Sequence, residues 1–239
     1  MKRSALIAAL LLVSGFTVTA TAEEKPWTFS LGLSYLATSG NSESQTGGLD
    51  LSYKHNFDPW GLEVTGSYLN AEADGVDTAD RTFLGVRGTR AIGERWGLFA
   101  GASALKDTFA GLDSRYVVDG GVTYKAIAND THTLTFDLGA AWNSENLVDG
   151  GSTDYVSGVA GLAYAWKISS TATLGEKLVF MPSFEESDDW RLASDLTLEA
   201  AISAKLAVKL GFLYLYDNVP VAGFEKTDTK SSASLVVKL

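Results

Sequence analysis

The chain has 239 residues, 29 of them acidic and 19 basic, with a formal net charge of −10 at pH 7 and no cysteine. The lack of cysteine excludes disulfides, thiol catalysis and cysteine-ligated metals. The acidic balance argues against a nucleic-acid partner, because phosphate contacts need a basic surface. A hydrophobic content of 46% argues against disorder.

The first 22 residues are predicted to be a signal peptide. Met1-Lys2-Arg3 supplies a basic start, the stretch from Ala5 to Val13 is apolar, and Ala20-Thr21-Ala22 has the small-residue pattern of a cleavage site. The apolar stretch is too short to span a bilayer as a helix, which takes about 18 residues. We therefore expect residues 1–22 to be a signal peptide and residues 23–239 to form one exported domain.

Short segments of alternating apolar and polar residues follow each other along that domain. In one of them, Leu134, Phe136 and Leu138 alternate with Thr135 and Asp137. Side chains of a strand point alternately to opposite faces, so this pattern predicts a two-sided sheet. The predicted strands are 27–38, 44–56, 60–72, 80–91, 95–107, 114–127, 131–143, 153–168, 171–184, 189–201, 204–217 and 227–239.

The connections and the aromatic residues predict a membrane barrel rather than a soluble sandwich. Short turns alternate with longer polar connections such as 73–79 and 217–226, as in barrels with short periplasmic turns and longer outer loops. Aromatic residues gather near both ends of the strands, where the two membrane interfaces lie. The predicted fold is all-β: a single closed antiparallel transmembrane β-barrel of about twelve strands with both termini periplasmic. The expected location is the outer membrane of a Gram-negative bacterium.

Charged residues on the less apolar faces of these strands are predicted to line the barrel interior. The candidates are Asp50, Lys54, Glu63, Arg87, Arg115, Asp119, Lys125, Asp137, Lys177, Arg191, Asp195 and Lys209. Mixed charges can pair and fill a narrow barrel, or they can line an aqueous path. Barrels of about eight strands are filled and those of about 16–18 are open, so we favour a narrow or mostly filled lumen.

Charge also differs between the two ends of the predicted barrel. The longer outer connections are acidic, whereas the short inner turns carry a slight positive charge. The simplest interpretation is a set of well-solvated loops. The alternative is a rim that attracts cations or binds divalent ions together with lipopolysaccharide. The expected partners are therefore outer-membrane lipid and lipopolysaccharide, with small solutes or cations as further candidates.

No catalytic motif stands out. The only histidines, His55 and His132, fall beside predicted periplasmic turns, and no serine is singled out as a nucleophile. The acidic pairs Glu185-Glu186 and Asp188-Asp189 lack the spacing of a calcium loop. We therefore predict no catalytic residue, no cofactor and no metal.

A family resemblance is carried by residues 37–56, by the stretch 176–183 that runs into 190–192, and by residues 216–223, 226–229 and 234–239. These stretches resemble the salt-induced outer-membrane proteins, the YdiY-like family of domain of unknown function 481. The resemblance implies an outer-membrane barrel with a name tied to salt response and with no agreed catalytic residues. Members usually end in an aromatic residue, which resembles the signal read by the barrel-assembly machinery, whereas this chain ends in Leu239.

These observations lead to one main functional hypothesis and two alternatives. The main hypothesis is a non-enzymatic outer-membrane barrel, either structural or a narrow porin-like channel for small solutes or ions, linked to salt or osmotic stress. The first alternative is a barrel hydrolase that acts on lipids or peptides. The second is a soluble secreted β-protein that binds a surface partner.

Overall fold

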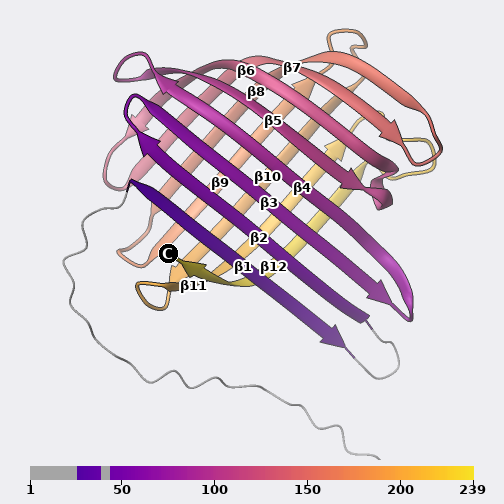
Figure 1. The fold of residues 1–239 in the computed structure, drawn as a ribbon, viewed down its shortest axis with the longest axis horizontal. Helices are drawn as coiled ribbons and strands as arrows, with labels where there is room; N and C mark the ends of the chain where they lie inside the picture. The colour runs from indigo at the N-terminus through magenta and orange to yellow at the C-terminus, as the bar shows by residue number, and fades with distance from the viewer. Residues whose placement is uncertain (1–25, 39–43) are drawn as a thin grey trace, which may run out of the picture.

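A computed structural model describes residues 26–38 and 44–239, and these residues form a barrel (Figure 1). The predicted signal peptide, residues 1–22, lies outside the described residues. The only helix among them is the short turn η1 (Thr108–Ala110). No helix in this part of the chain is long and apolar enough to cross a membrane.

Twelve strands form the barrel, each paired antiparallel with its neighbours in chain order, and β1 pairs with β12 to close the ring. The strands are β1 (Trp27–Thr38), β2 (Ser44–Phe57), β3 (Trp60–Ala73), β4 (Val76–Ala91), β5 (Trp96–Asp107), β6 (Leu112–Ala128), β7 (His132–Leu147), β8 (Ser152–Lys167), β9 (Ala172–Pro182), β10 (Trp190–Ala201), β11 (Leu206–Asp217) and β12 (Thr227–Lys238). The predicted closed twelve-stranded antiparallel barrel is confirmed. Closure gives every strand two neighbours, although β1 and β12 pair only from Ser30 to Leu33.

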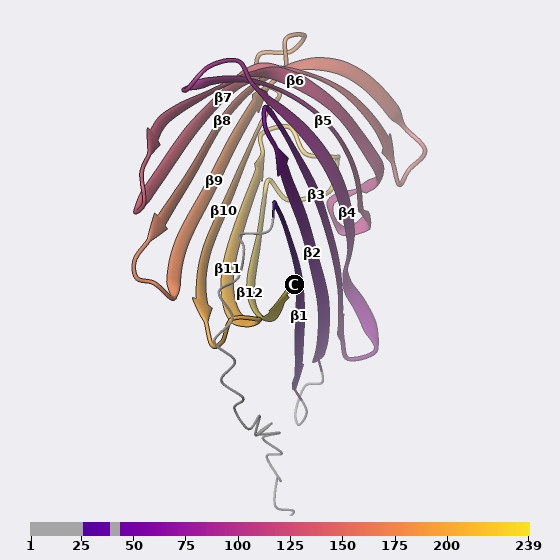
Figure 2. The same cartoon turned by 60° about the vertical axis from the view of Figure 1, so that its left-hand side comes forward.

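The two ends of the barrel differ in their connections. At one end, here called the turn end, short turns join β2 to β3, β4 to β5, β6 to β7, β8 to β9 and β10 to β11, and β1 begins and β12 ends there (Figure 1). At the other end, the loop end, the connections include residues 183–189 and 218–226. The C-terminus lies between β1 and β12 in Figure 2.

One predicted loop is wrong. Residues 73–79 were expected to form a long polar connection, but β3 and β4 stay paired as far as Ala73 and Val76. Asp74 and Gly75 form a tight turn between them, with φ values of 51° and 79°. Two adjacent residues with positive φ match the right-handed twist of a hairpin, and Asp-Gly is a favoured pair for it. The polar residues after Gly75 therefore belong to β4.

Large apolar side chains are exposed on the outer face of the barrel, as expected for contact with lipid. Examples are Leu33, Leu84, Val118, Leu138 and Leu210. The alternation also holds in β5, where Trp96 and Leu98 are exposed and Phe99 is buried inside. The guanidinium of Arg87 lies over the inward-facing ring of Phe99, with Cζ 3.8 Å from the ring centroid.

Glu176 is the one charged residue that the alternation places among lipid-facing leucines of β9. The alternation of inward and outward side chains continues through Glu176, because the pairing of β9 with β10 is unbroken from Leu174 to Leu178. Ser194 Oγ donates a hydrogen bond of 2.7 Å to Glu176 Oε1. On the other side Glu176 pairs with Tyr164, next to Trp166. The carboxylate therefore lies level with aromatic residues of the turn end, where the membrane interface lowers the cost of a charge.

Candidate functional site

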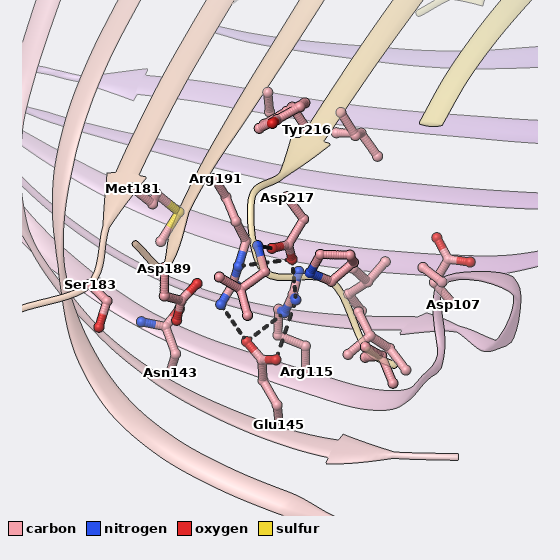
Figure 3. A pocket seen from close by; sticks show the side chains of 18 of the residues that line it. Asp107, Arg115, Asn143, Glu145, Met181, Ser183, Asp189, Arg191, Tyr216 and Asp217 are labelled. Carbon is pink, nitrogen blue, oxygen red and sulfur yellow. Dashed lines mark hydrogen bonds and ion pairs between the residues drawn. The ribbon is translucent and has the colours of Figure 1, made fainter. Parts of the chain in front are cut away.

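A network of four charged residues crosses the interior of the barrel near the loop end (Figure 3). Glu145 of β7 lies at its centre. Arg115 of β6 donates to both carboxylate oxygens of Glu145, at 2.9 and 3.3 Å, and Arg191 Nη2 of β10 lies 2.8 Å from Oε1. Asp217 of β11 bridges the same two arginines, at 3.4 Å from Arg191 Nε and 3.8 Å from Arg115 Nη2. The network therefore ties together strands on different sides of the ring.

This network is held in a largely desolvated position. The side chain of Glu145 is 8% exposed, and those of Arg115 and Arg191 are 16% and 15% exposed. Tyr155 of β8 donates its hydroxyl to Glu145, and the guanidinium of Arg191 lies over the Tyr155 ring. A buried carboxylate is stable only when its oxygens are paired and hydrogen-bonded, and Glu145 meets both conditions.

A cavity of about 440 Å³ surrounds the network at the loop end. Its wall includes the network itself, Asn143, and Asp189 from the loop before β10. Burial raises the pKa of Asp189 above its ordinary value, and the nearby carboxylates of Asp217 and Glu145 raise it further. The cavity therefore presents an acidic group that the two arginines do not fully compensate.

A second group of ion pairs lies deeper in the barrel. Lys54 and Lys177 both approach Glu63 Oε1, at 3.1 and 3.7 Å. Arg87 Nη2 lies 2.7 Å from Asp137 Oδ2, and Arg87 Nη1 lies 4.0 Å from Asp119. A smaller cavity of about 170 Å³ lies beside these side chains.

The pair between Glu63 and Lys177 shows how narrow this part of the lumen is. Glu63 belongs to β3 and Lys177 to β9, which occupy opposite positions in the ring of twelve strands. Two side chains that meet from opposite walls leave little free cross-section between them. The Lys177 side chain is nevertheless 58% exposed. The middle of the lumen is therefore narrow but not completely filled by side chains.

The structure brings together many of the predicted interior residues. Arg115 and Arg191 lie in the loop-end network, and Lys54, Glu63, Arg87, Asp119, Asp137 and Lys177 lie in the deeper group. The other four belong to neither group. In the strand pairing Asp50 lies opposite Gly32 and Ser67, and Lys209 lies opposite Glu199 and Ser234. Lys125 and Asp195 are exposed.

Sequence reasoning missed the centre of the loop-end network. Glu145 falls between the predicted strands 131–143 and 153–168, whereas β7 continues to Leu147. Asp217 ends both the predicted strand 204–217 and β11, but it is not among the predicted interior residues. The signal for Glu145 was present, because Asn143 and Glu145 continue the inward phase of Asp137 in steps of two residues. The sequence pattern singles out neither Asn143 nor Tyr155, and it marks Asp189 only as one of an acidic pair.

Both histidines face away from the lumen. His55 Nδ1 lies 3.1 Å from the hydroxyl of Tyr53, and its ring lies edge-on to Phe57. His132 Nδ1 lies 2.8 Å from the hydroxyl of Tyr164, and its ring stacks on Trp166. These contacts place both rings among the interfacial aromatic residues of the turn end.

Acidic residues do not converge into a metal site in residues 26–38 and 44–239. No group of three or more histidine, aspartate or glutamate side chains there is arranged to hold a metal ion. The acidic pairs that the sequence singled out lie on the exposed loop before β10, apart from the half-buried Asp189.

Comparisons with known proteins agree with this fold. Residues 31–239 match the model of the family described as "Protein of unknown function, DUF481". The uncharacterized protein YdiY of Escherichia coli (strain K12) is 25% identical over 215 residues, which cover 89% of this chain and 83% of YdiY.

Two solved structures have a similar fold. An outer membrane channel from Pseudomonas putida F1 has a TM-score of 0.54 at 14% identity, over 95% of this chain and all of that one. The translocator domain of the autotransporter NalP from Neisseria meningitidis has a TM-score of 0.51 at 11% identity, over 91% of this chain and 89% of that one. Because the family model covers nearly all of the barrel, the chain belongs to the DUF481 family of proteins of unknown function.

Proposed function

We propose that this protein is a non-enzymatic outer-membrane barrel that forms a narrow, charge-lined passage for small ions and solutes. The observation that carries the proposal is the ion pair of Glu63 with Lys177, which joins opposite walls of the lumen. A purely structural barrel of this width could fill its interior with apolar or tightly packed side chains. Here several interior charges remain accessible to water, including Lys177 and Lys54.

The proposal includes an orientation and a location. In outer-membrane barrels the short turns and the termini lie in the periplasm and the longer loops lie outside. The turn end would then face the periplasm, and the loop-end cavity would open toward the exterior. Cleavage after Ala22, insertion by the barrel-assembly machinery and contact with lipopolysaccharide belong to the same proposal.

Single-channel recording of the refolded protein in planar bilayers tests this function. We expect small, ion-sized conductance steps in the wild type. The charge-neutral double variant Glu63→Ser/Lys177→Ser removes the pair that joins opposite walls and should raise the conductance at least about twofold, because the constriction widens.

The matched control is Asp80→Ser/Lys106→Ser, which removes an ion pair of 3.6 Å between β4 and β5 outside both lumen networks. This control should conduct as the wild type does. Silence of the wild type and of the widened variant, with both shown to be folded and inserted, would mean that the lumen is sealed and would overturn the proposal.

A role in salt or osmotic stress rests on the family resemblance alone and is proposed with the channel. The expected result is a higher abundance of the protein in cells shifted to high salt. An unchanged abundance after the shift would contradict this part of the proposal.

A further inference from the structure

We infer that the loop-end cavity binds a small organic cation, namely an ammonium group carried on an alkyl stem. The inference deepens the proposed function, since it places a solute-binding site on the outer side of the passage. It depends on three features of the cavity: its charge, an unpaired buried acceptor and an apolar wall.

The charge of the cavity is negative after its internal pairs are counted. The arginines in its wall are already engaged: Arg81 pairs with Asp107, and Arg115 and Arg191 pair with Glu145 and Asp217. The rest of the wall carries five acids, Glu185, Glu186, Asp189, Glu225 and Asp228, against one remaining base, Lys226, whose ammonium donates to Asn218. In the described part of the chain none of these five acids takes part in an ion pair. A cavity with this balance attracts cations.

Asn143 provides an observation independent of the acidic residues. Its side chain is fully buried in the cavity wall, and its Nδ2 donates to Ser157 Oγ at 2.9 Å. Its Oδ1 has no hydrogen-bond donor among the described residues. Leaving a buried acceptor unpaired is costly, so such an atom calls for a partner. Figure 3 draws Asn143 and Asp189 close together among the side chains that line the cavity.

These two groups together suit an ammonium group. The ammonium N–H groups can donate hydrogen bonds to Asn143 Oδ1 and to the Asp189 carboxylate at the same time. An anion would meet acceptors at both positions. A hydroxyl could donate to only one of them and would carry no charge to balance Asp189.

The size and the apolar part of the wall favour an organic cation over a metal ion. A volume of about 440 Å³ is in the range of small-molecule sites. Leu105, Val117, Val179 and Met181 supply apolar surface for an alkyl stem. Residues 26–38 and 44–239 also contain no cluster of carboxylates arranged for a metal.

Isothermal titration of the refolded full-length chain in detergent micelles, at neutral pH and low ionic strength, tests the inference. The probe is 1,5-diaminopentane, and the matched ligands are pentan-1-ol and pentanoate. We expect the diamine to bind and the other two not to bind. Binding of pentanoate as strong as that of the diamine, or no binding of the diamine, would overturn the inference.

Two variants locate the site. Asp189→Asn and Asn143→Leu should each weaken diamine binding about tenfold or more, because each removes one recognition group. Asp113→Asn is the control, since Asp113 is exposed at the loop end and lies outside the cavity wall. A heat-modifiable gel shift confirms that each variant is folded. Unchanged binding in folded Asp189→Asn and Asn143→Leu would refute this site.

The titration does not depend on conductance, so the two proposals can fail separately. A sealed barrel that binds the diamine would overturn the channel and keep the site. A conducting barrel that does not bind the diamine would keep the channel and overturn the site.

Discussion

At the scale of single residues, Glu145 organises the interior of the loop end. One carboxylate accepts from Arg115, Arg191 and Tyr155, and its neighbours come from three other strands. Bidentate contacts of this kind fix geometry as well as charge. Removing the carboxylate charge would leave two guanidinium groups close together in a desolvated place, with Asp217 as their remaining counter-ion.

We therefore predict that Glu145→Gln destabilises the barrel by about 3 kcal/mol, because it removes one partner of a buried ion pair and leaves the other charge uncompensated. Urea unfolding of the refolded protein in lipid vesicles, followed by tryptophan fluorescence, measures the difference. Glu94→Gln, in an exposed turn, serves as the comparison and should change little. Equal stability of the two variants would contradict the central role of Glu145.

In contrast to Glu145, the ionised carboxylate of Asp189 lowers the stability of the folded barrel. Burial, and then the carboxylates of Asp217, Glu145 and Glu186, raise its pKa, whereas Arg115 lowers it. The folded state therefore penalises the ionised form, and the wild type loses stability as pH rises through the raised pKa. Asp189→Asn should be more stable than the wild type at neutral pH, and the gain should vanish below about pH 3.9, where both states are protonated. Urea unfolding at several pH values checks this prediction.

At the scale of elements, the seam between β1 and β12 is the shortest pairing in the ring. β1 pairs with β2 from Trp27 to Thr38, but with β12 only from Ser30 to Leu33. A further backbone hydrogen bond of 3.0 Å runs from Leu239 N to Phe29 O. The seam is thus closed toward the turn end, and its loop-end half has no ladder.

This difference predicts uneven hydrogen exchange. Amides of residues 34–38 that point toward β12 should exchange much faster than those of residues 44–48 in β2, which pair on both sides. Hydrogen–deuterium exchange with mass spectrometry of the folded barrel measures both segments in one experiment. Equal protection of the two segments would show that the seam is closed along its full length.

The sequence predicted the elements better than the site. Alternation and turn residues identified each strand, because both are local signals. The prediction at 73–79 fails because polar residues such as Asp77 and Thr78 favour a loop, whereas Asp74-Gly75 is a turn pair that keeps β3 and β4 together. Glu145 was missed because an extension of β7 above the apolar band has no apolar alternation to mark it. The partnership of Glu145 with Arg191 depends on the closed ring, which brings distant strands together.

At the scale of the whole molecule, the barrel combines an apolar outer face with an interior crossed by ion pairs at two levels. The deeper group joins β3 to β9, and the loop-end network joins β6 and β7 to β10 and β11. The chain as a whole carries a net charge of −10. Acidic residues that remain after pairing lie in the wall of the loop-end cavity, so a permeating ion would meet a negative potential there first.

This charge distribution predicts cation selectivity. A low-dielectric wall concentrates the field of Glu186 and Asp189 at the mouth of the passage, which raises the local concentration of cations over anions. In a salt gradient across a planar bilayer, the reversal potential should therefore have the sign of cation flow. Glu186→Gln/Asp189→Asn should shift it toward zero, whereas the exposed control Asp113→Asn should leave it unchanged. Because screening shortens the reach of these charges, the preference should also weaken as the mean salt concentration rises. A reversal potential at zero in the conducting wild type would show that these acids do not control which ions enter.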